Sequence, residues 1–336
     1  MNRFILSLLF GFFVVLLPVI GDAQWLDWSA LRNPVYQHEG WSVKDACMVY
    51  NEADSTFYLF FSAFYFDDGR ERSHLSAVKT KDFRSFSDPL FLWDGRKDGW
   101  IGLCSPNLTV VQGKYILTYN SWGDKKGKPN QLFYAVSEDL EHWERDIPLA
   151  HELTKGKRAI DASLAYHEGQ YILSWKGKKG KTRMACSESD LDSFQFINFG
   201  YPVYLMRGGG ENGKIHENYE YFQADDQWWC LSTDYAYNPY REHAPYLYKL
   251  KEAPSQFPSW LQWEDGYKIT IPIEEGFNNS YAANAAFICD WRAYDGYYYM
   301  VYAGRTENKT HAKRGDNKLG LARSRDLVNW TIAGER

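Results

Sequence analysis

The stretch Ala322-Arg-Ser-Arg-Asp-Leu-Val-Asn-Trp330 repeats Ala135-Val-Ser-Glu-Asp-Leu-Glu-His-Trp143, with Ala, Ser, Asp, Leu and Trp at matching positions. Related endings occur at residues 77–86 and 185–194, where Phe takes the place of Trp. In each copy a strand-like run enters a turn whose Asp can bond nearby backbone amides, and an aromatic residue then returns to the core. Four copies of one strand-turn-aromatic pattern indicate internal repeats.

A hairpin signal precedes each of these endings. Short aromatic and β-branched runs bounded by Asp and Gly, such as Tyr115-Ile-Leu-Thr-Tyr119 and Tyr171-Ile-Leu-Ser-Trp175, are typical of paired strands. Five such units are spaced by roughly 60 residues, as four-stranded blades require. Their predicted starts are Asp45, Ser105, Asp161, Glu217 and Asn284. The fourth unit lacks the Ser-x-Asp ending and has residues 255–263 in its place.

We therefore predict an all-β protein, a single five-bladed β-propeller over residues 24–336 with four antiparallel strands per blade. The alternative is a β-sandwich whose turns are similar by coincidence. The composition agrees with a packed β-protein, because 18% of the 336 residues are aromatic and 45% are hydrophobic. The net charge of -5 argues against a nucleic-acid-binding protein.

The first residues have the pattern of a signal peptide. Arg3 precedes an apolar run, Phe4 to Ile20, which is followed by Gly21-Asp22-Ala23. We predict a secretory signal peptide, residues 1–23, and an exported protein, periplasmic or extracellular, that has no membrane span after cleavage. A membrane anchor is the alternative, but 17 apolar residues are marginal for a span.

The five cysteines, Cys47, Cys104, Cys186, Cys230 and Cys289, form no CxxC pair. Structural zinc is therefore not expected, and buried free thiols are the prediction. One disulfide in an oxidising compartment is the alternative. His216-Glu217-Asn-Tyr-Glu220 lacks the second His of a zinc-peptidase helix, so that interpretation is rejected.

Carboxylates stand at three of the five predicted blade starts. In a propeller the first strand of each blade faces a central channel, and the five starts read Asp45, Ser105-Pro-Asn107, Asp161, Glu217 and Asn284. A buried carboxylate is costly unless it is paired or used. The pattern indicates one asymmetric site at one mouth of the channel.

These motifs resemble those of the five-bladed glycosidases of glycoside hydrolase family 43 and its relatives. Lys44-Asp45-Ala is similar to the motif of the family's catalytic base, and Ala159-Ile-Asp-Ala-Ser163 is similar to its Ile-Asp-Pro-Ser. Ser105-Pro-Asn107 takes the place of Ala-Pro-Asp, and Glu217-Asn-Tyr219 that of Glu-Gly-Pro. The resemblance covers nearly the whole chain after the predicted signal peptide.

The resemblance implies a hydrolase that inverts at the anomeric carbon and releases a pentose, as arabinofuranosidases and xylosidases do. Asp45 would be the ionised base and Glu217 the general acid, its pKa raised by burial and by neighbouring carboxylates. Asp161 would orient Glu217 and keep it protonated. Strand-end capping is the alternative for Asp45 and Asp161, and Glu220 is the alternative acid. No cofactor is expected, although some enzymes of this kind hold calcium in the channel.

Further residues are candidates for sugar contacts. The aromatic platforms would be Trp41, Trp122, Trp175, Tyr235 and Tyr237, for which core packing is the alternative. Asn107 and His216 are further candidate substrate-binding residues. Arg305 would bond substrate hydroxyls, with His311 a weaker candidate. Basic segments at 125–128, 155–158 and 176–181 are either a cationic rim for an acidic polysaccharide or solvated hairpin tips.

Other functions on the same fold stay open. A non-catalytic sugar-binding propeller would have nearly identical blades, whereas these differ most at their starts. Enzymes related to the anhydro-galactose-releasing group or to the mannoside phosphorylases are further alternatives. In each case the expected partner is a carbohydrate.

Overall fold

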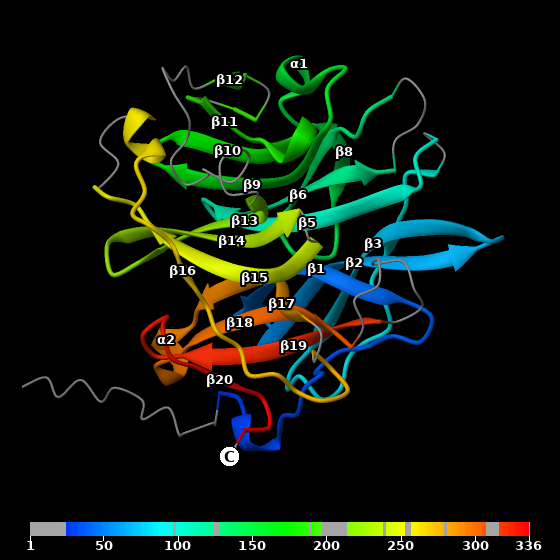
Figure 1. Cartoon of the computed structure of the whole chain (residues 1–336), viewed down its shortest axis with the longest axis vertical. Coiled ribbons are helices and arrows are strands. Elements are labelled where there is room, and N and C mark those ends of the chain that lie inside the picture. Colours follow the sequence, from blue (N-terminus) through cyan, green and yellow to red (C-terminus); the bar gives the residue numbers. More distant parts are fainter. Residues whose placement is uncertain are drawn as a thin grey trace, which may run out of the picture.

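The structure is a computed structural model that describes residues 25–96, 99–123, 128–188, 190–191, 193–196, 214–237, 240–252, 257–278, 281–306 and 316–335 (Figure 1). Within these residues the regular structure is almost all strand, and each α-helix is a single turn. The helical elements are η1 (Trp28–Ala30), α1 (His151–Thr154), η3 (Lys178–Gly180), η5 (Phe257–Leu261) and α2 (Arg292–Asp295). The all-β prediction is therefore confirmed.

In the described residues, the strands follow one another in five units of four. Unit 1 has β1 (Ser42–Asn51), β2 (Thr56–Asp67), β3 (Arg70–Thr80) and β4 (Leu92–Trp93), and unit 2 has β5 (Gly102–Val111), β6 (Lys114–Trp122), β7 (Leu132–Ser137) and β8 (Glu144–Pro148). Unit 3 has β9 (Ala159–His167), β10 (Gln170–Gly177), β11 (Thr182–Ser187) and β12 (Gln195–Phe196). Unit 4 has β13 (Lys214–Ala224), β14 (Gln227–Tyr237), β15 (Tyr240–Lys249) and β16 (Tyr267–Lys268). Unit 5 has β17 (Tyr281–Asp290), β18 (Tyr298–Arg305), β19 (Asn317–Ser324) and β20 (Trp330–Ile332).

Each unit is an antiparallel sheet in which consecutive strands pair. Units 3, 4 and 5 are separate four-stranded sheets. Units 1 and 2 are joined by one parallel bridge, Ser73 to Gly102. The bridge is possible because Gly102 has no side chain, and a Cβ there would lie 1.7 Å from the Ser73 carbonyl oxygen. The predicted four-stranded antiparallel sheets are confirmed.

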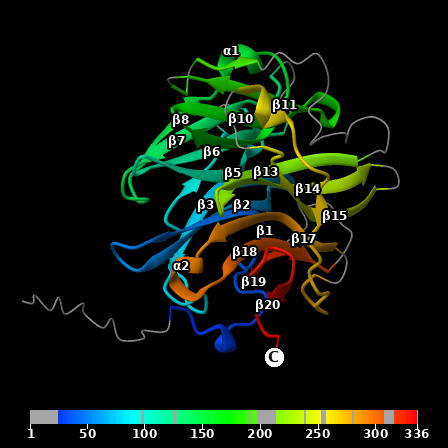
Figure 2. The same cartoon turned by 90° about the vertical axis from the view of Figure 1, so that its left-hand side faces the viewer.

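The five units are arranged in a closed ring. The first strands, β1, β5, β9, β13 and β17, contact one another in order, and β17 returns to β1. Figures 1 and 2 show the first unit, in blue, beside the last unit, in orange and red. The N-terminal segment joins the last sheet through a bridge from Tyr36 to Leu319. Asn33 reinforces it, since its Oδ1 accepts a hydrogen bond from the Leu321 N–H at 2.8 Å.

The repeated endings found in the sequence form the same turn. Asp139 Oδ1 accepts hydrogen bonds from the N–H groups of Glu141 and His142 at 2.9 and 2.8 Å. Asp326 Oδ1 does the same for Val328 and Asn329, at 3.0 and 2.8 Å. These bonds satisfy backbone donors that the end of a strand would otherwise leave unpaired. The turn returns Trp143 and Trp330 to the sheets.

The many aromatic side chains pack mainly between the sheets. Trp260, Tyr58 and Tyr119 are among the largest fully buried side chains. Buried rings of this size contribute a large apolar area, which a ring of narrow sheets needs for stability. In the described part of the chain, no helix is long and apolar enough to cross a membrane.

Candidate active site

All five first strands bend at one equivalent residue with left-handed backbone. These residues are Asp45, Ser105, Asp161, Asn218 and Ala285, with φ between 46° and 57°. The register of β1, β5, β13 and β17 shifts at this point, as in a β-bulge. The bend directs the five residues, and the residue that follows each of them, toward a common axis.

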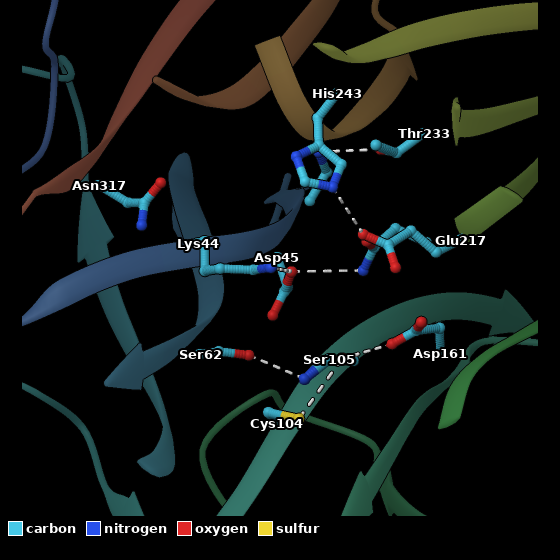
Figure 3. Close-up of polar contacts among 12 residues, drawn as sticks. Lys44, Asp45, Ser62, Cys104, Ser105, Asp161, Glu217, Thr233, His243 and Asn317 are labelled. Atoms are coloured by element: carbon cyan, nitrogen blue, oxygen red, sulfur yellow. Dashed lines mark hydrogen bonds and ion pairs between the residues drawn. The ribbon is translucent and has the colours of Figure 1, made fainter. Parts of the chain in front are cut away.

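A narrow pocket lies on this axis. Its walls are the five left-handed residues, the residues that follow them, and Asn107 and Phe287. Asp45 and Asp161 therefore reach one pocket from units 1 and 3. Figure 3 shows their carboxylates and that of Glu217 around the same space. Glu217 does not line the pocket, but it lies next to Asn218, which does.

The sequence prediction places the starts of the fourth and fifth units one residue too early. The structural equivalents of Asp45 are Asn218 and Ala285, whereas Glu217 and Asn284 stand one residue earlier. Asn tolerates the left-handed conformation better than most residues, which explains why Asn218 occupies a position where the resembled motif has Gly. The side chain of Asn284 lies outside the described residues.

Neighbouring units are tied together by one recurring hydrogen bond. A polar side chain on the second strand accepts the N–H of the left-handed residue in the next unit. Ser62 bonds to Ser105, Asn120 to Asp161, and Thr233 to Ala285, at 2.7, 2.8 and 2.9 Å. A buried N–H without a partner would cost free energy, so these bonds hold the bends in place.

The equivalent positions of the other two units, Ala303 and Lys176, do not follow this rule. Lys176 pairs in register with Ile160, as Ser62, Asn120 and Thr233 pair with the equivalent residues of their own units. A lysine ammonium cannot accept a hydrogen bond. Instead, its Nζ lies 3.0 Å from Asp161 Oδ2 and also contacts Glu217 Oε2. Lys176 is only 6% exposed, so the prediction of a solvated hairpin tip is wrong for this lysine.

The three predicted catalytic carboxylates belong to one buried network of charges. Asp45 Oδ1 lies 3.1 Å from Lys44 Nζ and accepts a hydrogen bond from Asn218 Nδ2 at 3.3 Å. Asp161 Oδ1 accepts a hydrogen bond from Ser105 Oγ at 2.8 Å. The ammonium of Lys176 contacts both Asp161 and Glu217. Asn218, the residue that follows Glu217, donates to Asp45.

A second basic pair borders Glu217. Its Oε1 lies 3.7 Å from His243 Nε2. On the other side of the imidazole, His243 Nδ1 lies 3.4 Å from Arg305 Nη2. Burial lowers the pKa of His243 to about 3, so its imidazole is neutral at pH 7. Arg305, a predicted sugar contact, is 3% exposed at the end of β18.

The electrostatics of the carboxylates differ from the prediction. Burial raises the pKa of Asp45, and the charge of Lys44 opposes this. Burial alone would also raise the pKa of Glu217, but nearby charges, of which that of Lys176 has the largest effect, outweigh it and lower the pKa to about 2. The expected raised pKa of Glu217 is therefore wrong, because the ammonium of buried Lys176 lies beside it.

Glu220, the alternative acid, lies in an apolar environment away from these charges. Its Oε2 accepts a hydrogen bond from the Ile288 N–H at 2.7 Å. Burial raises its pKa well above the ordinary value. Neither Glu220 nor Glu217 lines the axial pocket. The geometry favours Glu217 as the residue that acts with Asp45 and Asp161, because Glu217 shares the Lys176 ammonium with Asp161.

The residues predicted to contact the sugar differ in where the structure places them. Asn107 lines the pocket, but its amide already donates to the Tyr219 carbonyl at 3.1 Å and accepts from Ser163 Oγ. Trp41 is partly exposed and stacks on His38 at 3.5 Å, and Trp122 is partly exposed at the end of β6. The side chains of Tyr235 and Tyr237, and all of His311, lie outside the described residues.

Two of these predictions are wrong. Trp175 is 3% exposed and belongs to an apolar cluster, because it stands at the core position of Tyr119 in the repeat rather than at that of Trp122. His216 is buried, and its Nδ1 lies 2.6 Å from Asp234 Oδ1. Tyr248 OH donates to the same carboxylate at 2.8 Å. Adjacent strand residues point to opposite faces, so His216 is directed away from Glu217.

The cysteines are free thiols, as predicted. Cys47, Cys104 and Cys230 are buried, and Cys186 and Cys289 are partly buried. Among the described residues, no group of three or more His, Cys, Asp or Glu side chains has the arrangement of a metal site.

No known protein-family model matches the chain, and no curated protein sequence matches it. Solved structures do match. One is a glycoside hydrolase of the GH130 family of mannoside phosphorylases, from a study of β-1,2-mannosidic linkages in Candida mannan. It has 15% identity and a TM-score of 0.63 over 89% of this chain and 87% of that one. The native Bacillus subtilis arabinanase has 13% identity and a TM-score of 0.56, covering 86% of this chain and 95% of that one.

A thermostable family-43 glycoside hydrolase is similar over 91% of this chain and 96% of its own, with 13% identity and a TM-score of 0.58. At such identities the likeness concerns the fold. It confirms, at the level of the fold, the resemblance to family-43 glycosidases and their relatives.

Proposed function

We propose that this chain is an exported glycoside hydrolase, built as a five-bladed β-propeller, that cleaves glycosidic bonds with Asp45, Asp161 and Glu217. The observation that carries the proposal is that these carboxylates come from three units of the ring to one place: Asp45 and Asp161 line the axial pocket, and Glu217 lies beside it and shares the Lys176 ammonium with Asp161. Burying three carboxylates together is costly, and no packing need explains it. The fold shared with glycosidases supports the same conclusion.

The roles follow from the chemistry of acetal hydrolysis. One carboxyl group must donate a proton to the leaving oxygen, and a carboxylate on the opposite face must activate water or attack directly. Asp45 is proposed as the base and Glu217 as the acid. Asp161 is proposed as a positioning residue, since it shares the Lys176 ammonium with Glu217.

Glu217 can act as the acid only when its pKa rises on substrate binding, because the free protein holds it as a carboxylate beside Lys176. A proton donor with a pKa near the working pH is the most effective. Any productive substrate must therefore weaken the contact between Lys176 and Glu217. This requirement distinguishes the site from one in which the acid is already protonated.

The sugar and the stereochemistry are proposed from the resemblance. A pentoside substrate and inversion follow the family-43 pattern, and a mannoside substrate is the second candidate, favoured by the likeness to the GH130 structure. The proposed export rests on the apolar segment that ends at Ile20.

The test is a cleavage assay of the purified protein on aryl pentosides, aryl mannosides, and plant, algal and yeast polysaccharides. Asp45→Asn protein is the negative control, and NMR of the first-formed anomer distinguishes inversion from retention. A protein that binds one of these sugars but cleaves none of them would be the non-catalytic propeller instead.

A further inference from the structure

The five left-handed residues of the first strands differ in what their side chains do. Asp45 and Asp161 are carboxylates, and each accepts a hydrogen bond from another member of the set. Asn218 Nδ2 donates to Asp45 Oδ1 at 3.3 Å, and Ser105 Oγ donates to Asp161 Oδ1 at 2.8 Å. The fifth member, Ala285, has no polar side-chain group, although its backbone bends in the same way. The bend therefore needs no side-chain donor, and the two donors match the two carboxylates.

The hydrogen bond from Asn218 to Asp45 crosses the axis of the ring. β13, which carries Asn218, contacts β9 and β17, whereas β1, which carries Asp45, contacts β5 and β17. The bonds that Ser62, Asn120 and Thr233 accept all join neighbouring units. The bond to Asp45 instead joins unit 4 to unit 1, with unit 5 between them in the ring. It connects the proposed base to the strand that carries the proposed acid.

The backbone on both sides of Asn218 is held by hydrogen bonds. Asn107 Nδ2 donates to the Tyr219 carbonyl oxygen at 3.1 Å. Tyr219 OH donates to the His216 carbonyl oxygen at 2.9 Å and lies 2.6 Å from Thr182 Oγ1. These bonds fix the chain one residue after Asn218 and two residues before it. A side chain on a fixed backbone can hold its partner in one orientation.

The burial of the Asp45 charge does not by itself call for Asn218. The Asp45 side chain is 3% exposed, and Lys44 Nζ lies 3.1 Å from its Oδ1. The ammonium supplies the opposite charge that a buried carboxylate needs. It stands on a long flexible side chain, however, and gives little direction. A second donor on the same oxygen, from the opposite side of the axis, restricts the rotation of the carboxylate.

On the basis of the proposed function, we infer that Asn218 is a positioning residue for the base: its amide holds the ionised carboxylate of Asp45 in a fixed orientation relative to the strand that carries Glu217. A donor amide stabilises a carboxylate more than it stabilises the neutral acid. Base catalysis needs both the charge and its placement. Asn218 serves both without contributing a charge of its own.

Several groups set the ionisation of Asp45 together. Burial raises the pKa of Asp45 and the charge of Lys44 opposes this, while the charge of Asp161 raises the pKa and the Ser62 hydroxyl lowers it. The groups that face Asp45 are Lys44 of β1, Ser62 of β2, Cys104 of β5, Asp161 of β9 and Asn218 of β13. Removal of the Asn218 donor should therefore raise the pKa of Asp45, because one group that favours the ionised form is lost.

The experiment replaces Asn218 by glycine and by aspartate in the full chain, with an aryl pentoside as the substrate. Glycine adopts the left-handed backbone freely, so a purely conformational role of Asn218 predicts no loss. We expect Asn218→Gly to lower kcat by about tenfold with little change in KM. The acidic limb of kcat/KM should move up by about one pH unit, the effect of one hydrogen bond to a charged group. Asn218→Asp keeps the shape but places a second carboxylate beside Asp45, so its limb should move further.

The matched control is Asp226→Gly, in the exposed turn at the other end of β13. Asp226 is also left-handed, with φ at 58°. Because it lies outside the site, its replacement should leave kcat and the pH profile unchanged. An equal loss in Asp226→Gly and Asn218→Gly would overturn the inference, since it would trace the loss to the backbone of β13.

A measurement without substrate separates this inference from the proposed hydrolase. Carbon-13 NMR of protein labelled at the aspartate carboxyl groups follows the titration of Asp45, whose signal is the one missing from Asp45→Asn protein. The pKa of Asp45 should be higher in Asn218→Gly than in the wild type. An unchanged pKa, or a raised pKa with normal kcat, would overturn the positioning role. A raised pKa in a chain that cleaves no glycoside would confirm the contact but overturn the proposed function, and the catalytic role of Asn218 with it.

Discussion

The side-chain oxygen of Asn120 accepts the backbone N–H of Asp161 at 2.8 Å, across the boundary between two sheets. The bond fixes the left-handed turn that directs the Asp161 carboxylate into the axial pocket. Ring closure and site geometry are therefore coupled through one polar contact, which has equivalents at Ser62 and Thr233.

Asn120→Ala should affect both stability and activity. It leaves the buried N–H of Asp161 without an acceptor, which costs about 1–3 kcal/mol in the free energy of unfolding. Misplacement of Asp161 should also lower kcat, by about tenfold or more. Urea unfolding and steady-state kinetics measure the two effects.

The control is Thr233→Val, which removes the equivalent bond to the uncharged Ala285. It should cost similar stability and much less kcat. If the two variants lose kcat equally, the bond at Asn120 has no special part in placing Asp161.

Much of the fold could be predicted because its signals are local. The Ser-x-Asp turns need only neighbouring backbone amides, so Asp139 and Asp326 could be identified in the sequence as turn residues. The left-handed bends are harder to predict, since they depend on contacts with the next sheet. This explains the error of one residue at Glu217 and Asn284.

The charge network could be predicted only in part. Acidic residues at the starts of the first strands gave a signal, whereas Lys176 lies on a second strand and belongs to a run of lysines that is otherwise typical of a hairpin tip. One sequence signal was present: Tyr171-Ile-Leu-Ser-Trp-Lys176 aligns with Tyr115-Ile-Leu-Thr-Tyr-Asn120. A lysine at the position of a buried polar residue marks a change of role.

Glu220→Gln should make the stability less sensitive to pH. Burial raises the pKa of Glu220 well above the value near 4.5 of the unfolded chain. The folded protein therefore holds a proton that the unfolded chain releases, and its stability falls as pH rises above about 4.5 toward the folded pKa. Glutamine mimics the neutral acid and removes this loss.

Urea unfolding at pH 4, 6 and 8 measures the effect. The variant should match the wild type at pH 4 and exceed it in stability at pH 8, with kcat little changed at pH 6. A variant that is less stable than the wild type at pH 8 would show that Glu220 is ionised in the fold.

The stability that Glu217 contributes should change with pH in the direction opposite to that expected for Glu220. Burial would raise the pKa of Glu217, but nearby charges, of which that of Lys176 has the largest effect, lower it to about 2, below the unfolded value of 4.5. The stabilisation is present above pH 4.5 and is lost as pH falls from 4.5 toward 2. The difference in unfolding free energy between wild type and Glu217→Gln should shrink over this window, and a constant difference would contradict the pairing with Lys176.

The kinetics of Glu217→Gln should depend on the leaving group. Glutamine cannot donate the proton, so cleavage of natural glycosides should be abolished while binding of neutral sugars remains largely intact. Aryl glycosides with good leaving groups need little protonation and should keep part of their activity. If Glu220→Gln has this profile instead, the acid has been assigned to the wrong carboxylate.

Asp45→Asn gives the sharpest test of the site. Asparagine preserves the shape and can still contact Asn218, but it removes the negative charge that faces Lys44. If Asp45 activates water or attacks directly, kcat should fall by at least about 10³-fold whatever the leaving group, since the base acts on the face opposite the departing oxygen. This independence from the leaving group separates Asp45 from Glu217. Azide should restore activity if Asp45 is a nucleophile, and should have little effect if it is an inverting base. Near-normal kcat in Asp45→Asn would mean that the residue only stabilises the bend of β1, and catalysis by the three carboxylates would have to be abandoned.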